Sequence, residues 1–168
     1  MEIKMETTHS TGLSVEHALI EYCDWKESSK EDNIHRDIDA WTRDDESVSI
    51  KYQPTCLKTG NVAFEVQLID PKNNESIPSW FHTGEAEIYA FVIGYTLYEF
   101  NKKELRDTII ERNKDKKYRK TKLTSRARID SNVGRKYSQS MCILVPLKSI
   151  LSMAKTHTLD ESFRGMLK

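Results

Sequence analysis

Hydrophobic and polar positions alternate along three consecutive segments in the first half of the chain, residues 36–42, 48–53 and 62–69. This period of two predicts β-strands, because successive side chains of a strand point to opposite faces of a sheet. The apolar positions of the second and third segments are Val48, Ile50, Tyr52, Val62, Phe64, Val66 and Leu68. A hairpin between these two segments would bring their apolar faces together, and we expect that pairing.

The polar faces of these segments carry acids and a lysine. In the expected hairpin Lys51 and Glu65 fall on the same face, whereas Asp37, Asp39 and Trp41 share a face of the first segment. Carboxylates are natural ligands of Mg²⁺, which activates a water and neutralises charge at phosphorus, and a nearby lysine can orient that water or stabilise the developing charge. The joint pattern therefore indicates metal-assisted hydrolysis of a phosphodiester, whereas any one of these residues taken alone fits a solvated strand face.

Later segments predict further helices and strands. Asn101 and Glu104 have the spacing of a capping box at the start of a helix, and Ser14 can cap a helix near the N-terminus. The expected elements are helices over residues 15–26, 102–112 and 147–154 and strands over residues 87–93, 96–100 and 141–145. The chain therefore predicts an α/β fold.

Length and composition predict a single domain over residues 1–168. No apolar run approaches the roughly 20 residues of a membrane-spanning helix, and the N-terminus lacks a signal-peptide pattern, so no membrane association is expected. Cys23, Cys56 and Cys142 are few and odd in number, which favours a reducing, cytoplasmic compartment. The sequence has no Cys-x-x-Cys pair, and its histidines do not have the spacing of zinc ligands. We therefore expect no structural zinc site.

Charge is distributed unevenly along the chain, although the formal net charge is zero. Residues 1–50 hold 5 Lys or Arg against 13 Asp or Glu, whereas residues 102–136 hold 14 against 5. Such asymmetry suggests a nucleic-acid surface beside an acidic site. Residues 113–137 have little apolar periodicity, so we expect a basic loop or arm there that binds the phosphate backbone; the alternative is a solubilising linker. The expected nucleic-acid contacts are Lys116, Lys117, Arg119, Lys120, Arg126 and Arg128.

In these acids and this lysine the chain resembles the PD-(D/E)xK nuclease superfamily, which includes many restriction endonucleases, Holliday-junction resolvases and phage exonucleases. In that family an aspartate opens one strand, and an acid–any–lysine triplet follows on the next. Asp39 matches the aspartate, but the triplet is split. Ser49-Ile50-Lys51 has a serine in place of the acid, and Glu65-Val66-Gln67 has a glutamine in place of the lysine. The resemblance covers roughly residues 14–112.

Two interpretations of the split triplet restore a site. Either Glu65 has migrated one strand along and works with Lys51, or Glu65-Val66-Gln67 is the whole motif, a variant that some restriction enzymes show. Both interpretations keep Asp39 and Glu65 as catalytic metal ligands and leave open whether Lys51 or Gln67 takes the role of the lysine. Members of the family often lend a further acid from the preceding helix, and Glu16 is the candidate by position.

The resemblance implies a restriction-endonuclease-like fold, with a central mixed β-sheet flanked by α-helices. It implies a Mg²⁺-dependent DNA endonuclease that could also use Mn²⁺, and a possible homodimer, because many relatives act as dimers. The segment around Trp80 would help to shape the substrate cleft, or would simply pack on the core. The alternative function is a non-catalytic nucleic-acid-binding or inhibitor protein that retains the fold, which Ser49 favours. A further alternative is a small interaction protein whose basic arm binds an acidic partner.

Overall fold

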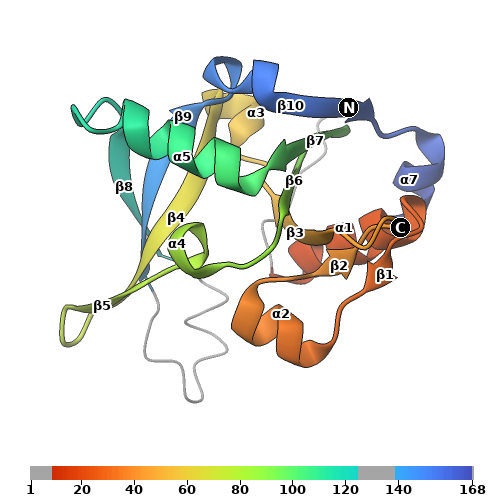
Figure 1. Cartoon of the computed structure of the whole chain (residues 1–168), viewed down its shortest axis with the longest axis horizontal. Coiled ribbons are helices and arrows are strands. Elements are labelled where there is room, and N and C mark those ends of the chain that lie inside the picture. The colour runs from red at the N-terminus through yellow and green to blue at the C-terminus, as the bar shows by residue number, and fades with distance from the viewer. Residues whose placement is uncertain (1–8, 125–138, 168) are drawn as a thin grey trace.

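The computed structural model describes residues 9–124 and 139–167, and its strands form two β-sheets (Figure 1). The strands of the first sheet, in spatial order, are β1 (Lys26–Glu27), β2 (Ala40–Trp41), β3 (Ser47–Tyr52), β6 (Ile88–Ile93), β7 (Thr96–Asn101) and β10 (Ala154–Thr158). Those of the second sheet are β5 (Glu75–Pro78), β4 (Asn61–Asp70), β9 (Gln139–Pro146) and β8 (Arg119–Thr124). Because β3 runs parallel to β6 while the other pairs are antiparallel, the first sheet is mixed.

Helices and short helical turns pack around the two sheets, so the fold is α/β as expected (Figure 1). The helices are α1 (His9–Tyr22), α2 (Lys30–Arg36), α3 (Cys56–Thr59), α4 (Trp80–Thr83), α5 (Lys102–Arg112) and α7 (Glu161–Met166), and the 3₁₀ turns are η1 (Leu147–Ser149) and η2 (Leu151–Met153). In the described part of the chain no helix combines the length and the hydropathy needed to cross a membrane.

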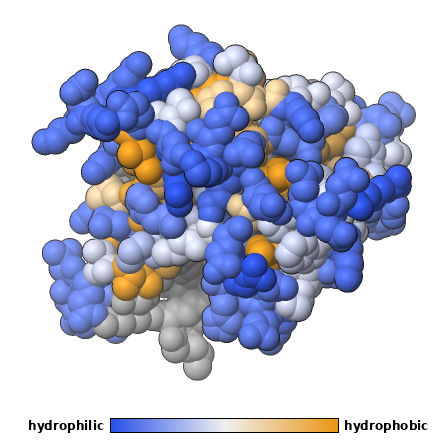
Figure 2. All heavy atoms as spheres, in the orientation of Figure 1, coloured by the Kyte–Doolittle hydropathy of each residue, from blue (hydrophilic) through white to orange (hydrophobic). Residues whose placement is uncertain are grey.

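The first sheet separates two hydrophobic cores. On one face Tyr89 and Phe91 of β6 pack with Phe64 of the second sheet and with Leu105 of α5. On the other face apolar residues of β3, β6 and β7 pack against α1 and α7. The alternation along β3 therefore directs Val48, Ile50 and their neighbours toward α1 and sets the intervening polar residues on the opposite face. Hydrophilic residues cover most of the molecular face in Figure 2, with hydrophobic residues in separate patches.

Several expected elements are confirmed. Helix α5 spans residues 102–112, and the side chain of its N-cap Asn101 accepts from the backbone N–H of Glu104. Strands β6 and β7 form the expected hairpin, and β9 contains the expected buried strand at residues 141–145. Residues 147–153 form two short 3₁₀ turns in place of the expected helix. Helix α1 starts at His9, earlier than expected, so Ser14 lies within the helix and does not cap it.

The expected hairpin between residues 48–53 and 62–69 is wrong. Helix α3 intervenes after β3, and Gly60, with φ +70°, ends that helix in the left-handed conformation. The chain then enters the second sheet, where β4 pairs with β5 and β9. The apolar faces of β3 and β4 therefore lie in separate cores: Phe64 belongs to the core between the sheets and Val48 to the core beneath α1.

The expected first strand, residues 36–42, is largely not a strand. Ser29 caps α2 by accepting from the Asp32 N–H, and that helix extends to Arg36. Asp37 follows with φ +54°, a left-handed conformation that aspartate tolerates better than most residues. Only Ala40 and Trp41 pair with β3 in this segment. The acids of this segment therefore project from a helix end and a short connection.

Candidate functional site

Asp37 and the polar face of β3 form the centre of the site. The Lys51 ammonium lies 2.7 Å from Asp37 Oδ1, and the Ser49 hydroxyl donates to Asp37 Oδ2 at 2.8 Å. Ser49 is completely buried, and the Lys51 side chain is 15% exposed. Both carboxylate oxygens of Asp37 are therefore held by consecutive polar positions of one strand.

Gly84 allows Asp37 to adopt this position. A Cβ atom at Gly84 would lie 2.9 Å from Asp37 Oδ2 and 2.8 Å from the Trp80 carbonyl oxygen, closer than ordinary van der Waals contact. The backbone of Gly84 itself is extended, with φ −61°, so its role is to leave space and not to supply a special conformation. An open hollow of about 210 Å³, lined in part by Asp37, Ser79 and Trp80, adjoins this contact.

Asp39 is fixed beside this group and is only 6% exposed. Its Oδ2 accepts from the backbone N–H of Ile50 at 2.6 Å, and its Oδ1 accepts from the Asn33 side-chain amide at 2.6 Å. Burial raises the pKa of Asp39, while the positive charge of Lys51 opposes that rise. Each carboxylate oxygen has two lone-pair sites, so Asp39 is held in one orientation and keeps acceptor capacity for a ligand.

Lys51 lies among acids and remains charged. Burial disfavours its ammonium form, but the charges of Asp37 and Asp39 and the hydrogen bond to Asp37 outweigh burial and hold its pKa above the ordinary value. Glu65 also contributes to this effect from the second sheet. The ammonium lies 4.8 Å from the centre of the Trp80 ring, in a cation–π contact.

Glu65 reaches this region from β4 with the help of a β-bulge. Glu65 pairs with Cys142 and Gln67 with Met141, so Val66 is the extra residue. The Val66 carbonyl accepts from the Ser79 N–H at 3.0 Å, and the Ser79 hydroxyl donates to the Glu65 carboxylate. The Ser79 contacts thus connect Glu65 to the start of α4, where Trp80 lies.

Gln67 lies apart from this group. It is exposed and pairs with Pro78 of β5, at the edge of the second sheet. Of the two candidates for the lysine role, the structure therefore sets Lys51, and not Gln67, beside Asp39.

Glu16, the auxiliary candidate, belongs to the same electrostatic group. Its pKa is raised to about 7, first by burial and then by the charge of Asp39, with Lys51 acting in the opposite direction. Glu16 projects from α1, which packs against β3. Helix α1, the connection after α2, β3 and β4 therefore each contribute one or more charged residues to one region.

The donor chemistry suits a hard divalent cation, because Asp39, Glu65 and Glu16 bring carboxylate oxygens, the ligands that Mg²⁺ prefers, to the region of Lys51. The side chains are not gathered into a ready-made ligand cage: within residues 9–124 and 139–167, no three His, Cys, Asp or Glu side chains form a close metal-binding group. Ser49 donates to Asp37 and carries no negative charge of its own, so it does not replace the missing acid of the triplet.

The basic candidates lie elsewhere, and the expected loop is only partly a loop: residues 113–118 form neither helix nor strand, whereas residues 119–124 form strand β8. Arg119 and Lys120 begin β8, which forms an edge of the second sheet, and Lys116 and Lys117 belong to the exposed turn before it. Because adjacent strand residues point to opposite faces, Arg119 and Lys120 cannot bind the same surface. The remaining candidates, Arg126 and Arg128, lie outside the described residues.

Sequence reasoning missed several contacts of the site. It grouped Asp37 with Asp39 by alternation but assigned Asp37 no role, whereas Asp37 is the direct partner of Lys51. The contact between Ser79 and Glu65 joins positions fourteen residues apart and has no local sequence signal. Trp80 packs against the core, which was one of the two roles expected for its segment. Its ring also contacts the Lys51 ammonium.

Comparison of the chain with protein-family models, curated protein sequences and solved structures returned no match. The fold itself defines an α/β protein with a mixed sheet and a second, antiparallel sheet. Its distinguishing feature is a partly buried group of acids around one lysine.

Proposed function

We propose that this protein is a metal-dependent DNA endonuclease of the restriction-endonuclease-like type, which hydrolyses phosphodiester bonds with Mg²⁺ or, as a substitute, Mn²⁺. The observation that carries the proposal is the position of the Lys51 ammonium. It is held by Asp37 and influenced by the charges of Asp39 and Glu65, which come from a helix–strand connection and from a second sheet. We extend the proposal to a cytoplasmic protein that acts on DNA and can work as a homodimer.

Asp39, Glu65 and Glu16 are the residues that would hold the cation. Asp39 has a fixed orientation and spare acceptor capacity. The pKa values of Asp39 and Glu16 are raised because burial and neighbouring acids disfavour their negative charges more than Lys51 stabilises them. Such carboxylates are typical of functional sites. Bound Mg²⁺ would supply Lewis acidity at phosphorus and lower the pKa of a water ligand.

Lys51 has the chemistry to stabilise the negative charge that develops on a phosphoryl oxygen. Its pKa above the ordinary value keeps the side chain positively charged at neutral pH, and a fixed charge in a partly buried site stabilises such a transition state without reorganisation. Asp37 acts as a positioning residue, because it holds Lys51 while Ser49 holds its second oxygen.

A non-catalytic nucleic-acid-binding or inhibitor protein is the second candidate. Two observations favour it: Ser49 stands where the nuclease triplet has an acid, and Lys51 is already in direct contact with a carboxylate. In this alternative the charged group would be a structural remnant that supports the fold.

Incubation with DNA distinguishes the two functions. The purified protein is mixed with supercoiled, linear and branched DNA in buffers containing Mg²⁺, Mn²⁺ or EDTA, and the products are separated on gels. The nuclease proposal predicts nicked or linear products with either cation and none in EDTA. Binding without cleavage in all three buffers would instead support the non-catalytic candidate.

A further inference from the structure

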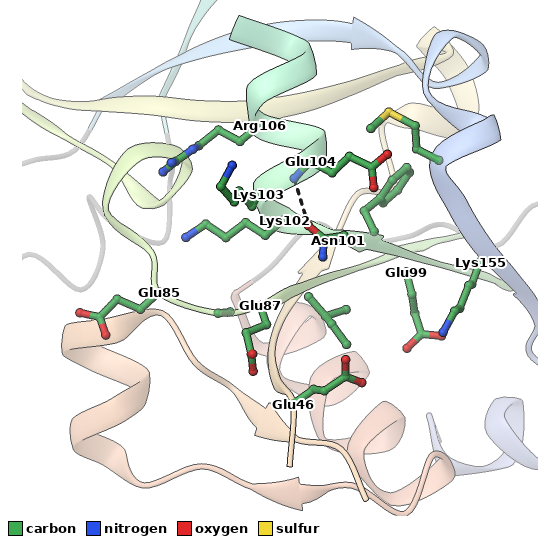
Figure 3. Close-up of a pocket in the computed structure, with 14 residues that line it drawn as sticks. Glu46, Glu85, Glu87, Glu99, Asn101, Lys102, Lys103, Glu104, Arg106 and Lys155 are labelled. Carbon is green, nitrogen blue, oxygen red and sulfur yellow. Dashed lines mark hydrogen bonds between the residues drawn. The ribbon is translucent and has the colours of Figure 1, made fainter. Parts of the chain in front are cut away.

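Lys102 and Arg106 lie one helical turn apart on α5, and in Figure 3 both side chains extend to the same side of the helix. Lys102 is only 7% exposed, which is rare for a lysine. Its ammonium lies 5.9 Å from the centre of the Tyr89 ring. Both residues line a hollow of about 670 Å³, a space large enough to admit a phosphate group. Five glutamates also line this hollow: Glu46, Glu85, Glu87, Glu99 and Glu104.

This pair is connected to the site around Lys51 by two aromatic rings in contact, Trp80 and Tyr89. The rings of Trp80 and Tyr89 meet edge to face, with centroids 5.4 Å apart. The Lys51 ammonium contacts Trp80 and the Lys102 ammonium contacts Tyr89, so one lysine lies against each ring. Burial lowers the pKa of Lys102, and the nearby charge of Arg106 lowers it further, while Asp37 raises it. The basic pair and the acidic site therefore interact electrostatically.

The basic groups of this pair lack full protein partners. Arg106 Nε is buried without a hydrogen-bond partner, and Arg106 Nη1 has only a 3.5 Å contact with the His82 carbonyl oxygen. In the described part of the chain, neither Lys102 nor Arg106 has a carboxylate within ion-pair distance. A buried donor without an acceptor is unfavourable, so a phosphate that enters the hollow and accepts from this guanidinium would be stabilised.

Three of the glutamates that line this hollow are engaged elsewhere: Glu99 contacts His157 at 2.6 Å, and Glu85 and Glu87 have partners on other elements. Glu85 forms a 2.6 Å ion pair with Arg36, and Glu87 accepts hydrogen bonds from the backbone and side chain of Ser47. The adjacent Lys103 shows the ordinary behaviour of a helix lysine, because it is exposed and pairs with Asp107 at 2.7 Å. Lys102 and Arg106 thus differ from their neighbours in both burial and pairing.

We propose that Lys102 and Arg106 form a phosphate-binding subsite, which holds a backbone phosphate of the DNA strand beside the phosphate that is cleaved at Lys51. The assignment to DNA rests on the proposed function. The Arg106 guanidinium offers a planar fork that matches phosphate oxygens, and Lys102 adds a point charge. Both residues lie in the first half of the eleven-residue α5, and Lys102 is its first residue, so the helix dipole also favours an anion there.

The test measures DNA binding, so it does not depend on cleavage. A fluorescein-labelled duplex is titrated with Arg106→Gln, Lys102→Gln and the matched control Lys103→Gln in EDTA, at several salt concentrations, by anisotropy. We expect each subsite variant to bind about five- to twentyfold more weakly. The slope of log affinity against log salt should become shallower by about 0.9 for each lost contact. Lys103→Gln should stay within about twofold of the wild type, since it removes an exposed, paired charge.

One further measurement and one further variant keep the outcome decisive. Thermal unfolding establishes that each variant is folded; because Arg106 is less buried than Lys102, Arg106→Gln carries the test if Lys102→Gln unfolds. Arg106→Lys should recover part of the lost affinity, because it keeps the charge. Folded variants that bind DNA as Lys103→Gln does, with the same salt slope, would overturn the subsite.

The result also separates the subsite from the proposed function. If the wild type cleaves DNA and the subsite variants bind normally, the subsite is wrong and the nuclease proposal stands. If the wild type binds DNA without cleaving it and the subsite variants lose affinity, the nuclease proposal is wrong and the subsite stands. A wild type that does not bind DNA at all would contradict both.

Discussion

The ammonium of Lys51 and the carboxylate of Asp37 meet at 2.7 Å, although fourteen positions separate them in the chain. Ser49 donates to the second oxygen of that carboxylate. This contact joins the left-handed residue after α2 to the polar face of β3. It holds Lys51 in place beside Asp39 and Glu65.

The first prediction concerns the energy of this ion pair. Removing one partner from a largely buried pair leaves the other uncompensated, so Asp37→Asn and Lys51→Met should each lower the free energy of unfolding by about 1–3 kcal/mol. The double variant should lose less than the sum of the two single losses. Urea denaturation of all four proteins measures the coupling energy. Strictly additive losses would show that the two residues do not interact.

The second prediction concerns the space at Gly84. An alanine there would place its Cβ against Asp37 Oδ2 and the Trp80 carbonyl oxygen. Gly84→Ala should therefore displace the Asp37 carboxylate and destabilise the protein by about 1–3 kcal/mol, as overpacking does elsewhere. Gly165→Ala is the matched control, because nothing lies within 4 Å of its added Cβ. Equal thermal stability of the two variants would contradict the close packing inferred at Gly84.

The third prediction concerns Glu16 and pH. Its pKa is about 7 in the folded protein, against an ordinary value of 4.5. Below pH 4.5 the side chain is neutral in the folded and unfolded states. Between these values the folded state keeps a proton that the unfolded state has lost, so stability falls as pH rises, and the full cost is present above pH 7.

Glu16→Gln removes this cost. In EDTA it should raise the free energy of unfolding at pH 8 by about 1–2 kcal/mol after allowance for solvent screening, with little change at pH 4.5. Urea denaturation at both pH values checks this, and Glu21→Gln on the same helix serves as the control. A stabilisation that is independent of pH would contradict the assigned burial of the Glu16 charge.

The fourth prediction concerns the basic segment before and within β8. If Lys116, Lys117, Arg119 and Lys120 all contact phosphate, changing the four together to alanine should make the salt slope of DNA binding shallower by about three to four units. Since Arg119 and Lys120 point to opposite faces of a strand, we expect at most three of the four to contact phosphate and a smaller change of about 2.7 units. Anisotropy titrations at several salt concentrations measure the slope. An unchanged affinity and slope would show that the segment does not bind DNA.

Local patterns predicted which face of β3 is polar better than they predicted the connections around that strand. Alternation placed Lys51 on a polar strand face, and the structure confirms that face because the neighbouring Val48 and Ile50 pack beneath α1. Alternation could not show that β4 belongs to a different sheet from β3, because the sheet to which β4 belongs depends on its long-range pairing with β9.

The left-handed turn at Asp37 and the bulge at Val66 were likewise not predictable from the sequence. Each depends on a local conformation that only the assembled sheets stabilise. The contact between Ser79 and Glu65 depends on the position of α4 against β4, which no spacing in the sequence specifies.

Cleavage of supercoiled DNA by matched variants tests the central claim most directly. Asp39→Asn removes the charge of Asp39 and keeps the shape of the side chain that accepts from the Ile50 N–H. Glu65→Gln likewise removes the charge of Glu65 and keeps the shape of the side chain that accepts from Ser79. Gln67→Ala, at an exposed position of the same strand, is the control. With Mg²⁺ we expect the two charge-removing variants to cleave at least about a hundredfold more slowly than the wild type, with DNA binding retained and Gln67→Ala unchanged. Cleavage by both variants at the wild-type rate would contradict the assignment of the active site.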